Sequence, residues 1–260
     1  MDTATHLTYL QYSDARGGRI AAIHANSDAQ VRTDNIVVYG NRFEEYGAGA
    51  VGIGGSRYVS ITGNVFYRNH SEFPYEESGG QLAFLKAQNL EGARDVFVVS
   101  NWFDGAYVSG PGGQTTTGIE GWGLTKANVQ GNESFHHTGQ GMSFLGARCL
   151  WIDPGTTGYK VESNSWQGIE IGNNPEPGLP QSGYIQSDST ISINNGRYGI
   201  EVNSAGVGSI NEVRVMGNTL TGNSWGPAYF AGVSNLCTSG NTPSLPTDVT
   251  VCGALPPCPY

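Results

Sequence analysis

The chain has 260 residues, 39 of them glycine, a net charge of −9 and charged side chains at only 13% of its positions. This composition fits a β protein with many tight turns, and it excludes a helical protein and a disordered acidic chain. Because no block of Lys and Arg is present, nucleic acid and anionic membranes are poor partners. The apolar runs are strand-sized and the residues after Met1 are polar, so the sequence predicts neither a transmembrane helix nor a signal peptide.

A short motif recurs along the chain: a β-branched or apolar residue, two further positions, an Asn, and an aromatic or apolar residue two places on. Its Asn stands at Asn41, Asn64, Asn101, Asn132, Asn164, Asn194, Asn218 and Asn241. A repeat of about 20 to 40 residues with one fixed Asn is typical of a solenoid, and the strand-forming residues before each Asn indicate β coils. We predict that these Asn stack at one turn of every coil and support the fold rather than the chemistry.

Three strands are expected in each coil: one that ends at the Asn, a short one after it, and one of the form Gly-Ile-x-Ile. The third strand is seen most clearly at Gly168-Ile169-Glu170-Ile171 and Gly199-Ile200-Glu201-Val202. This pattern resembles the right-handed parallel β-helix of the pectate-lyase-like superfamily, in its carbohydrate-active branch, over roughly residues 5 to 241. The resemblance implies an all-β, single-domain right-handed parallel β-helix with about eight coils and an internal Asn ladder.

The N-terminal segment differs from that superfamily, whose members usually begin with a helix that plugs the first coil. Here the residues from Leu7 to Tyr12 already read as a coil strand. An uncovered first coil exposes apolar surface and strand edges. We therefore expect the N-terminal coil to need an upstream segment or a partner chain.

The four cysteines point to an oxidising compartment. We predict a β-helix over residues 1–241 and a Cys- and Pro-rich tail over 242–260 that caps the last coil and is tied back by a disulfide, for which Cys237–Cys252 is the candidate among pairings that stay open. Cys149 lies in an apolar strand and is expected to be a buried thiol, with the pairing of Cys258 left open. Because a disulfide in the tail requires an oxidising compartment, we expect an extracellular, secreted protein.

The candidate chemistry lies on the outward face of the Gly-Ile-x-Ile strands, because the inward positions are apolar. The outward column is predicted to read Gly52, Ala83, Glu120, Ser143, Glu170, Glu201 and Phe230. Like charges in register destabilise a sheet, so stacked Glu residues suggest a functional role. Repulsion between neighbouring carboxyls raises the pKa of one of them, which can then act as an acid. Glu120, Glu170 and Glu201 are therefore the predicted catalytic residues.

Glycoside hydrolysis uses such a carboxyl pair. Glu170 and Glu201 would be about 5 Å apart, which fits a retaining enzyme, and Glu120 and Glu170 about 10 Å apart, close to an inverting one. Two other interpretations stay open, a calcium ion held between the acids and ordinary solvent-facing surface.

Substrate contacts are predicted beside the carboxyls. The candidates are Trp122, Ser143, His137, Lys126 and Arg148. Trp122 follows Glu120 on the same face and offers a flat apolar surface to a sugar ring. Long connections, among them 69–80 and 104–117, are expected to wall a groove over these strands.

Three functions follow. The leading one is an endo-acting glycoside hydrolase on a polysaccharide. The second is a calcium-dependent lyase on a uronate polymer, with Lys126 or Arg148 as the base, although the net charge of −9 argues mildly against a polyanion. The third is a non-catalytic glycan-binding or structural segment of a larger surface protein.

Overall fold

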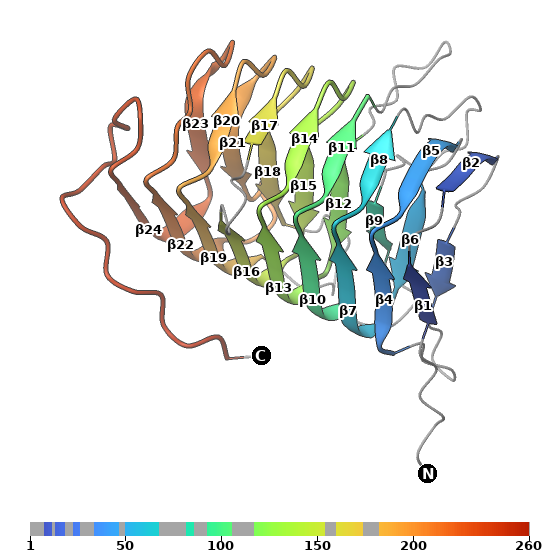
Figure 1. Cartoon of the computed structure of the whole chain (residues 1–260). Coiled ribbons are helices and arrows are strands. Elements are labelled where there is room, and N and C mark those ends of the chain that lie inside the picture. Colours follow the sequence, from blue (N-terminus) through green and yellow to red (C-terminus); the bar gives the residue numbers. More distant parts are fainter. Residues whose placement is uncertain are drawn as a thin grey trace.

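The chain winds into a right-handed parallel β-helix (Figure 1). The computed structural model describes residues 8–11, 14–18, 23–26, 34–46, 50–67, 82–85, 93–105, 117–153, 160–173 and 182–259. In these segments every named element is a strand and every strand pair is parallel, which confirms the predicted fold class. No helix in the described segments is long and apolar enough to cross a membrane.

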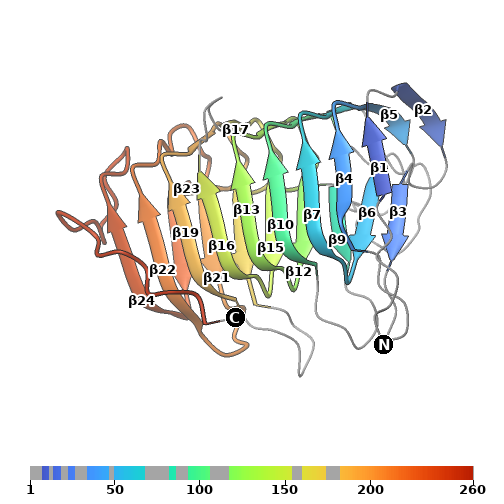
Figure 2. The same cartoon turned by 60° about the horizontal axis from the view of Figure 1, so that its bottom comes forward.

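The strands form three sheets, and each full coil gives one strand to each sheet (Figures 1 and 2). Sheet A contains β1 (Thr8–Gln11), β4 (Ile36–Tyr39), β7 (Arg57–Thr62), β10 (Arg94–Val99), β13 (Thr125–Gln130), β16 (Arg148–Asp153), β19 (Gly183–Asp188), β22 (Ile210–Met216) and β24 (Val233–Ser239). Sheet B contains β2 (Asp14–Gly18), β5 (Arg42–Tyr46), β8 (Val65–Tyr67), β11 (Trp102–Asp104), β14 (Glu133–Phe135), β17 (Lys160–Glu162) and β20 (Ile191–Ile193). Sheet C contains β3 (Ile23–Asn26), β6 (Val51–Gly54), β9 (Leu82–Leu85), β12 (Ile119–Trp122), β15 (Met142–Leu145), β18 (Ile169–Gly172), β21 (Tyr198–Asn203) and β23 (Gly226–Ala231). The Gly-Ile-x-Ile strands are those of sheet C.

Inward side chains stack into one apolar core along the axis. Phe43, Phe66 and Phe103 lie directly above one another, with ring centroids 5.0 and 4.6 Å apart. Ile169 and Ile171 are fully buried, whereas Glu170 between them is partly exposed. This alternation fixes which residues of sheet C face outward.

Glycines at the start of the sheet C strands bring successive coils close together. A Cβ added at Gly168 would lie 1.9 Å from the Ser192 hydroxyl and 2.8 Å from the Gly199 carbonyl oxygen. Added Cβ atoms at Gly118, Gly141 and Gly199 would meet the next coil's carbonyl oxygen at 2.7 to 2.8 Å. The Gly of the motif is therefore a packing requirement.

A first asparagine ladder follows the turn between sheets A and B. The backbone N–H and Nδ2 of each Asn donate to Oδ1 of the next, at 2.9 to 3.1 Å, through Asn41, Asn64, Asn101 and Asn132. The same turn carries Thr190, Asn218 and Asn241 further along the axis. This ladder confirms the predicted internal Asn column. Its hydrogen bonds satisfy backbone groups that are buried at the turn and need partners.

A second ladder follows the turn between sheets B and C. The His137 backbone N–H donates to Asn164, Asn164 to Asn195, and Asn195 to Asn223. The prediction of a single column through Asn164 and Asn194 is therefore wrong. Asn164 follows a sheet B strand instead of preceding one. The Asn194 side chain is exposed, and its backbone has a left-handed conformation with φ 56°. Both turns bury an amide in the same way, so the sequence motif reads alike at the two places.

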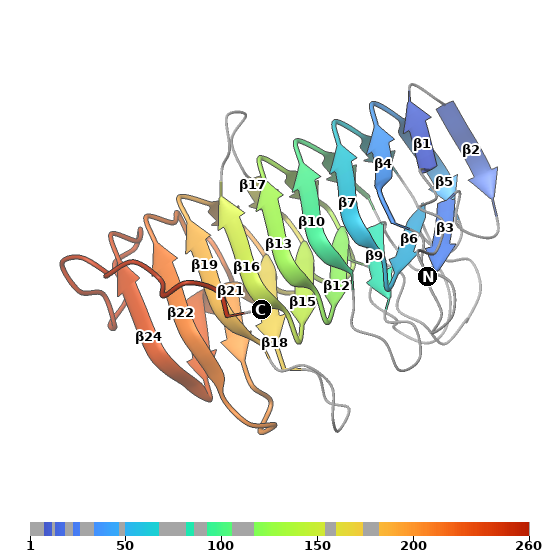
Figure 3. The ribbon, with the colours of Figure 1, turned by 90° about the horizontal axis from the view of Figure 1, so that it is seen from below.

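The C-terminal tail is joined to sheet A by two disulfides. Cys237 pairs with Cys252, as predicted, whereas Cys149 pairs with Cys258, so the expectation of a buried free thiol at Cys149 is wrong. We call residues 249–259 the strap, because Figures 1 and 3 show this segment running from β24 back across the outer side of sheet A. One disulfide joins the strap to β24 and the other joins it to β16, and these two strands are three positions apart in sheet A.

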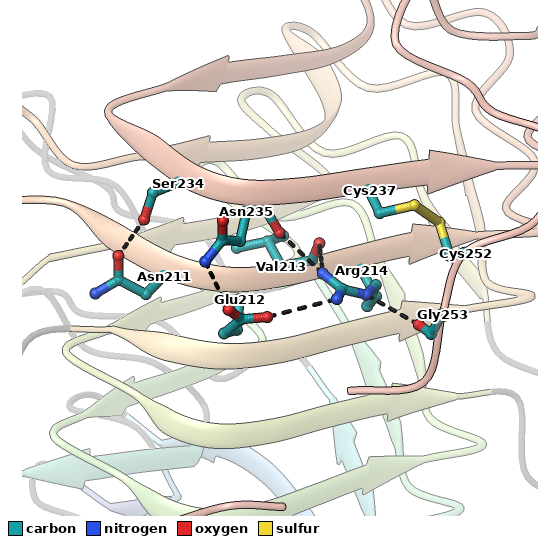
Figure 4. Close-up of polar contacts among 9 residues, drawn as sticks. All are labelled: Asn211, Glu212, Val213, Arg214, Ser234, Asn235, Cys237, Cys252 and Gly253. Carbon is teal, nitrogen blue, oxygen red and sulfur yellow. Dashed lines mark hydrogen bonds and ion pairs between the residues drawn. A yellow bond between two sulfur atoms is a disulfide. The ribbon is translucent and has the colours of Figure 1, made fainter. Parts of the chain in front are cut away.

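One arginine also holds the strap against the sheet (Figure 4). Arg214 on β22 donates from Nε to the Gly253 carbonyl at 3.1 Å and from Nη1 to the Asn235 carbonyl at 2.9 Å. Upstream of the strap, Asp248 accepts from Nδ2 of Asn241 at 2.9 Å, and Leu245 packs in the core. These contacts attach the tail to the last coils, while its boundary at residue 241 stays a prediction.

Candidate functional site

The outward face of sheet C brings four predicted residues into one row. Strand pairing places Glu120 beside Ser143, Ser143 beside Glu170, and Glu170 beside Glu201, and we call these four the carboxyl column. Neighbouring strands are about 4.8 Å apart, so Glu170 and Glu201 are direct neighbours and Glu120 stands two coils from Glu170.

The predicted end of this row is wrong by one residue. Tyr229 pairs with Glu201, while Phe230 pairs with the buried Val202 and packs against the core. A shift of one residue along a strand exchanges the two faces of a sheet, so Tyr229 takes the outward place that was assigned to Phe230.

Glu170 has one carboxylate oxygen held and one open. Its Oε2 accepts hydrogen bonds from Ser143 Oγ and Gln140 Nε2, both at 2.8 Å. Its Oε1 has no partner among the described residues, and the side chain is partly exposed. Burial raises the pKa of Glu170, and the charge of Glu201 raises it further, against the hydrogen bonds and the charge of Arg197. Glu170 is thus suited to carry a proton.

Glu201 is fixed on both oxygens. Gln167 Nε2 donates to Oε2, and Asn203 Nδ2 donates to Oε1 at 3.1 Å. Only 9% of the Glu201 side chain is exposed. Both oxygens of Glu201 are therefore held by amide donors, whereas Glu170 keeps one oxygen open.

Glu120 is hydrogen-bonded to Trp122, the residue predicted to contact a sugar ring. Trp122 Nε1 donates to Glu120 Oε1 at 2.8 Å, so the indole lies on the outward face as expected. Glu120 is 5% exposed and Trp122 is partly exposed. The bond orients both side chains and leaves the indole surface partly open to a ligand.

Two of the remaining candidates lie across the corner on sheet A. Arg148 begins β16 and pairs with Thr125, and Lys126 is the second residue of β13, with φ 55°. Neither belongs to the outward row of sheet C. Their roles as substrate contacts or as a base stay predictions.

His137 lies inside the coil, apart from the carboxyl column. Its side chain is 1% exposed and its Nε2 contacts Ser134 Oγ at 3.0 Å. Burial lowers the pKa of His137 to about 3, so the imidazole is neutral at physiological pH. Its backbone begins the second ladder, and a side chain in this position supports the turn between sheets B and C.

Gln140, Gln167 and Asn203 are the site residues that the sequence did not indicate. Both glutamines stand just before a sheet C glycine, and each reaches the carboxyl of the next coil. The repeated Gln-Gly at 140 and 167 is the signal that could have found them. Most of the predicted groove walls, including 69–80 and 106–116, lie outside the described residues.

In the described segments, no three His, Cys, Asp or Glu side chains are grouped as a metal site. Calcium at the acids therefore stays a prediction, resting on the three carboxyls of the column alone.

No family model and no curated protein matches the chain. Among solved structures, the periplasmic alginate epimerase AlgG has a TM-score of 0.52 at 13% identity, over 88% of this chain and 51% of AlgG. The Streptococcus pneumoniae surface protein and adhesin PfbA has a TM-score of 0.49 at 11% identity, over 92% of this chain and 80% of that one. The A-module of the Azotobacter vinelandii mannuronan C-5 epimerase AlgE6 has a TM-score of 0.41 at 15% identity, over 84% and 58%.

The chain thus spans about half the length of AlgG. At this identity the likeness to AlgG shows the parallel β-helix fold alone, since the same fold serves different chemistries.

Proposed function

We propose that this chain cleaves a polysaccharide by glycoside hydrolysis, with Glu170 as the general acid and Glu201 as its carboxylate partner. The observation that carries the proposal is the asymmetry of this pair. Glu170 has an open Oε1 and a pKa raised by burial, whereas both oxygens of Glu201 accept amide hydrogen bonds. An acid and a carboxylate on adjacent positions are the two groups that glycoside hydrolysis requires.

The spacing supports the retaining route. Adjacent parallel strands hold the two carboxyls about 5 Å apart, the separation of a retaining pair. Glu170 gives its proton to the glycosidic oxygen as the bond to the anomeric carbon breaks, and the Glu201 carboxylate forms a bond to that carbon. Water then replaces Glu201, and its proton goes to Glu170. Glu120 would act with Trp122 in holding the sugar next to the cleaved bond.

A second candidate is proton transfer on a uronate, leading to elimination or epimerisation. Arg197 favours it, because its positive charge acts on Glu170 and offers a partner for a uronate carboxylate. AlgG, by its name an alginate epimerase, adds an example of this chemistry on the same fold. Lys126 or Arg148 would be the base, and calcium would neutralise the carboxylate.

The two disulfides agree with an oxidising compartment. We therefore propose an extracellular or periplasmic location.

The test compares the unchanged chain with Glu170→Gln and Glu201→Gln on a panel of plant and algal glycans. We expect new reducing ends from the unchanged chain and a loss of about 10²- to 10⁴-fold in each variant, the range for general acid–base groups. Glu133→Gln on the outward face of sheet B is the matched control and should retain full activity.

The products separate the candidates. An unsaturated product that absorbs in the ultraviolet and disappears with a chelator would replace hydrolysis by elimination. A changed uronate composition without chain cleavage would indicate epimerisation. Full activity in both Glu variants would rule out the proposed pair, and glycan binding without any product would make the chain a binding protein.

A further inference from the structure

An exposed stack of aromatic and cationic side chains lies beside the C-terminal end of the carboxyl column. Trp166, Arg197 and Trp225 occupy equivalent places in three successive coils, at the turn between sheets B and C. Their backbones are joined coil to coil, from Arg197 N–H to the Trp166 carbonyl at 3.1 Å and from Trp225 N–H to the Arg197 carbonyl at 3.2 Å. The guanidinium lies 3.9 Å from the Trp166 ring centroid and 4.7 Å from that of Trp225.

Two tyrosines extend this stack toward Glu201. Tyr198 follows Arg197 and contacts Trp225 edge-on, with ring centroids 5.7 Å apart. It also stacks on Tyr229 at 5.2 Å, and Tyr229 is the strand partner of Glu201. We call these five residues, Trp166, Arg197, Tyr198, Trp225 and Tyr229, the aromatic–arginine corner.

The corner exposes the surfaces that a ligand needs. Trp225 is 59% exposed and Tyr229 is 40% exposed, so part of the surface of each side chain is open to solvent although Arg197 and Tyr198 pack on these rings. Among the described residues, the Arg197 side chain makes no hydrogen bond or ion pair; its guanidinium packs against the two indoles, and its charge acts on Glu170 at longer range. A guanidinium held flat between two rings is oriented in advance, and all its N–H donors lie at its edge.

These features specify one kind of ligand. Aromatic faces bind the apolar face of a sugar ring, and a guanidinium edge binds a carboxylate or sulfate through two parallel hydrogen bonds. The positions run along the helix axis, as do the carboxyls, so one glycan chain can contact both.

We propose that the aromatic–arginine corner binds an acidic sugar unit of the substrate chain, with Arg197 on its carboxylate or sulfate and Tyr229 and Trp225 against its ring. The inference rests on the proposed polysaccharide-cleaving function and narrows its substrate to an anionic glycan. The net charge of −9 disfavours binding of such a polymer elsewhere on the surface, so a guanidinium with no ion-pair partner among the described residues is the informative feature.

Binding is measured by affinity gel electrophoresis of the full chain in the Glu170→Gln background, so that the polymer is not cut. The probes are polygalacturonate and dextran sulfate, with methyl-esterified polygalacturonate and dextran as neutral counterparts. Arg197→Gln removes the charge, and Arg197→Lys keeps the charge without the planar fork. Arg42→Gln, at an exposed arginine paired with Glu44 on sheet B, is the matched control.

We expect at least one acidic probe to bind more tightly than its neutral counterpart. Arg197→Gln should weaken that binding by about 10- to 100-fold, the range for charge-assisted hydrogen bonds, and Arg197→Lys by less. Arg42→Gln should bind as the parent does.

Equal binding of acidic and neutral probes, or unchanged binding in Arg197→Gln, would overturn the inference. A lower melting temperature in Arg197→Gln with unchanged binding would assign the stack a purely structural role and also overturn it. Cleavage by the chain with Glu170 intact is assayed separately on the same polymers. Activity with no Arg197 effect refutes only the corner, and Arg197-dependent binding without activity refutes only the catalysis.

Discussion

Removing the disulfide between Cys149 and Cys258 should destabilise the protein more than removing the other one. The double variant Cys149→Ala/Cys258→Ala opens a link between residues separated by 109 positions, and Cys237→Ala/Cys252→Ala opens one between residues separated by 15. Alanine is chosen because Cys149 is fully buried, where a serine hydroxyl would need a partner.

The magnitudes follow from the lengths of the two closed segments. A link restricts the unfolded chain by an amount that grows with the logarithm of the segment length, which gives about 5 kcal/mol for the long link and about 3 kcal/mol for the short one. The difference between the two variants is therefore about 2 kcal/mol, in favour of the Cys149–Cys258 link.

Equilibrium unfolding in urea, with refolding checked from the unfolded side, measures the free energy of unfolding of both variants. The two values are compared with the same linear dependence on urea concentration. The unchanged chain under reducing conditions should lose roughly as much stability as the two double variants together, within the limits of non-additivity. Equal destabilisation in the two variants, or a larger loss from the short link, would refute the reasoning from chain entropy.

Four further outcomes are expected. In Glu170→Gln the free energy of unfolding should rise at neutral pH. The pKa of Glu170 is raised in the folded state, so this side chain costs stability as the pH rises above the ordinary pKa of glutamate. The gain in the variant should therefore vanish in acid, and urea midpoints measured across pH check this. By the same sign, activity should fall on the alkaline side as Glu170 loses its proton. Gly168→Ala should cost about 1 to 3 kcal/mol by overpacking, whereas Gly253→Ala, whose Cβ would meet nothing within 4 Å, should be neutral; thermal unfolding compares the two. Asn64→Ala leaves buried partners in both adjoining coils without their bonds and should cost about 2 kcal/mol or more; a wild-type melting temperature would contradict the ladder's role.

The fold could be predicted from the sequence because one pattern recurs with its packing logic intact. Strand formers before Asn64 and Asn101, and a glycine before Ile169, are local consequences of stacking coils. What failed was the assignment of Asn164 to one of two similar turns. Both turns bury an amide against the next coil, and only the strand pairing distinguishes them.

The site was predictable in part for a similar reason. Glu170 and Glu201 belong to clear copies of one strand motif, so their register followed from the sequence. The contacts that distinguish the two carboxyls cross between coils, from Gln140 to Glu170 and from Gln167 to Glu201, and no local pattern encodes them. The enclosed position of His137 could not be predicted, because a His in a connection gives no sign of lying inside the coil.

The strap makes the two ends of the solenoid unequal. Repeat proteins lose structure from their ends, coil by coil. The link from Cys149 to Cys258 closes a covalent ring of chain, and Glu170, Arg197 and Glu201 all lie within it, while Glu120 lies outside. Fraying should thus start at the N-terminal coils and stop at the ring. A protein nicked or partly melted on that side would keep Glu170 and Glu201 on adjacent strands.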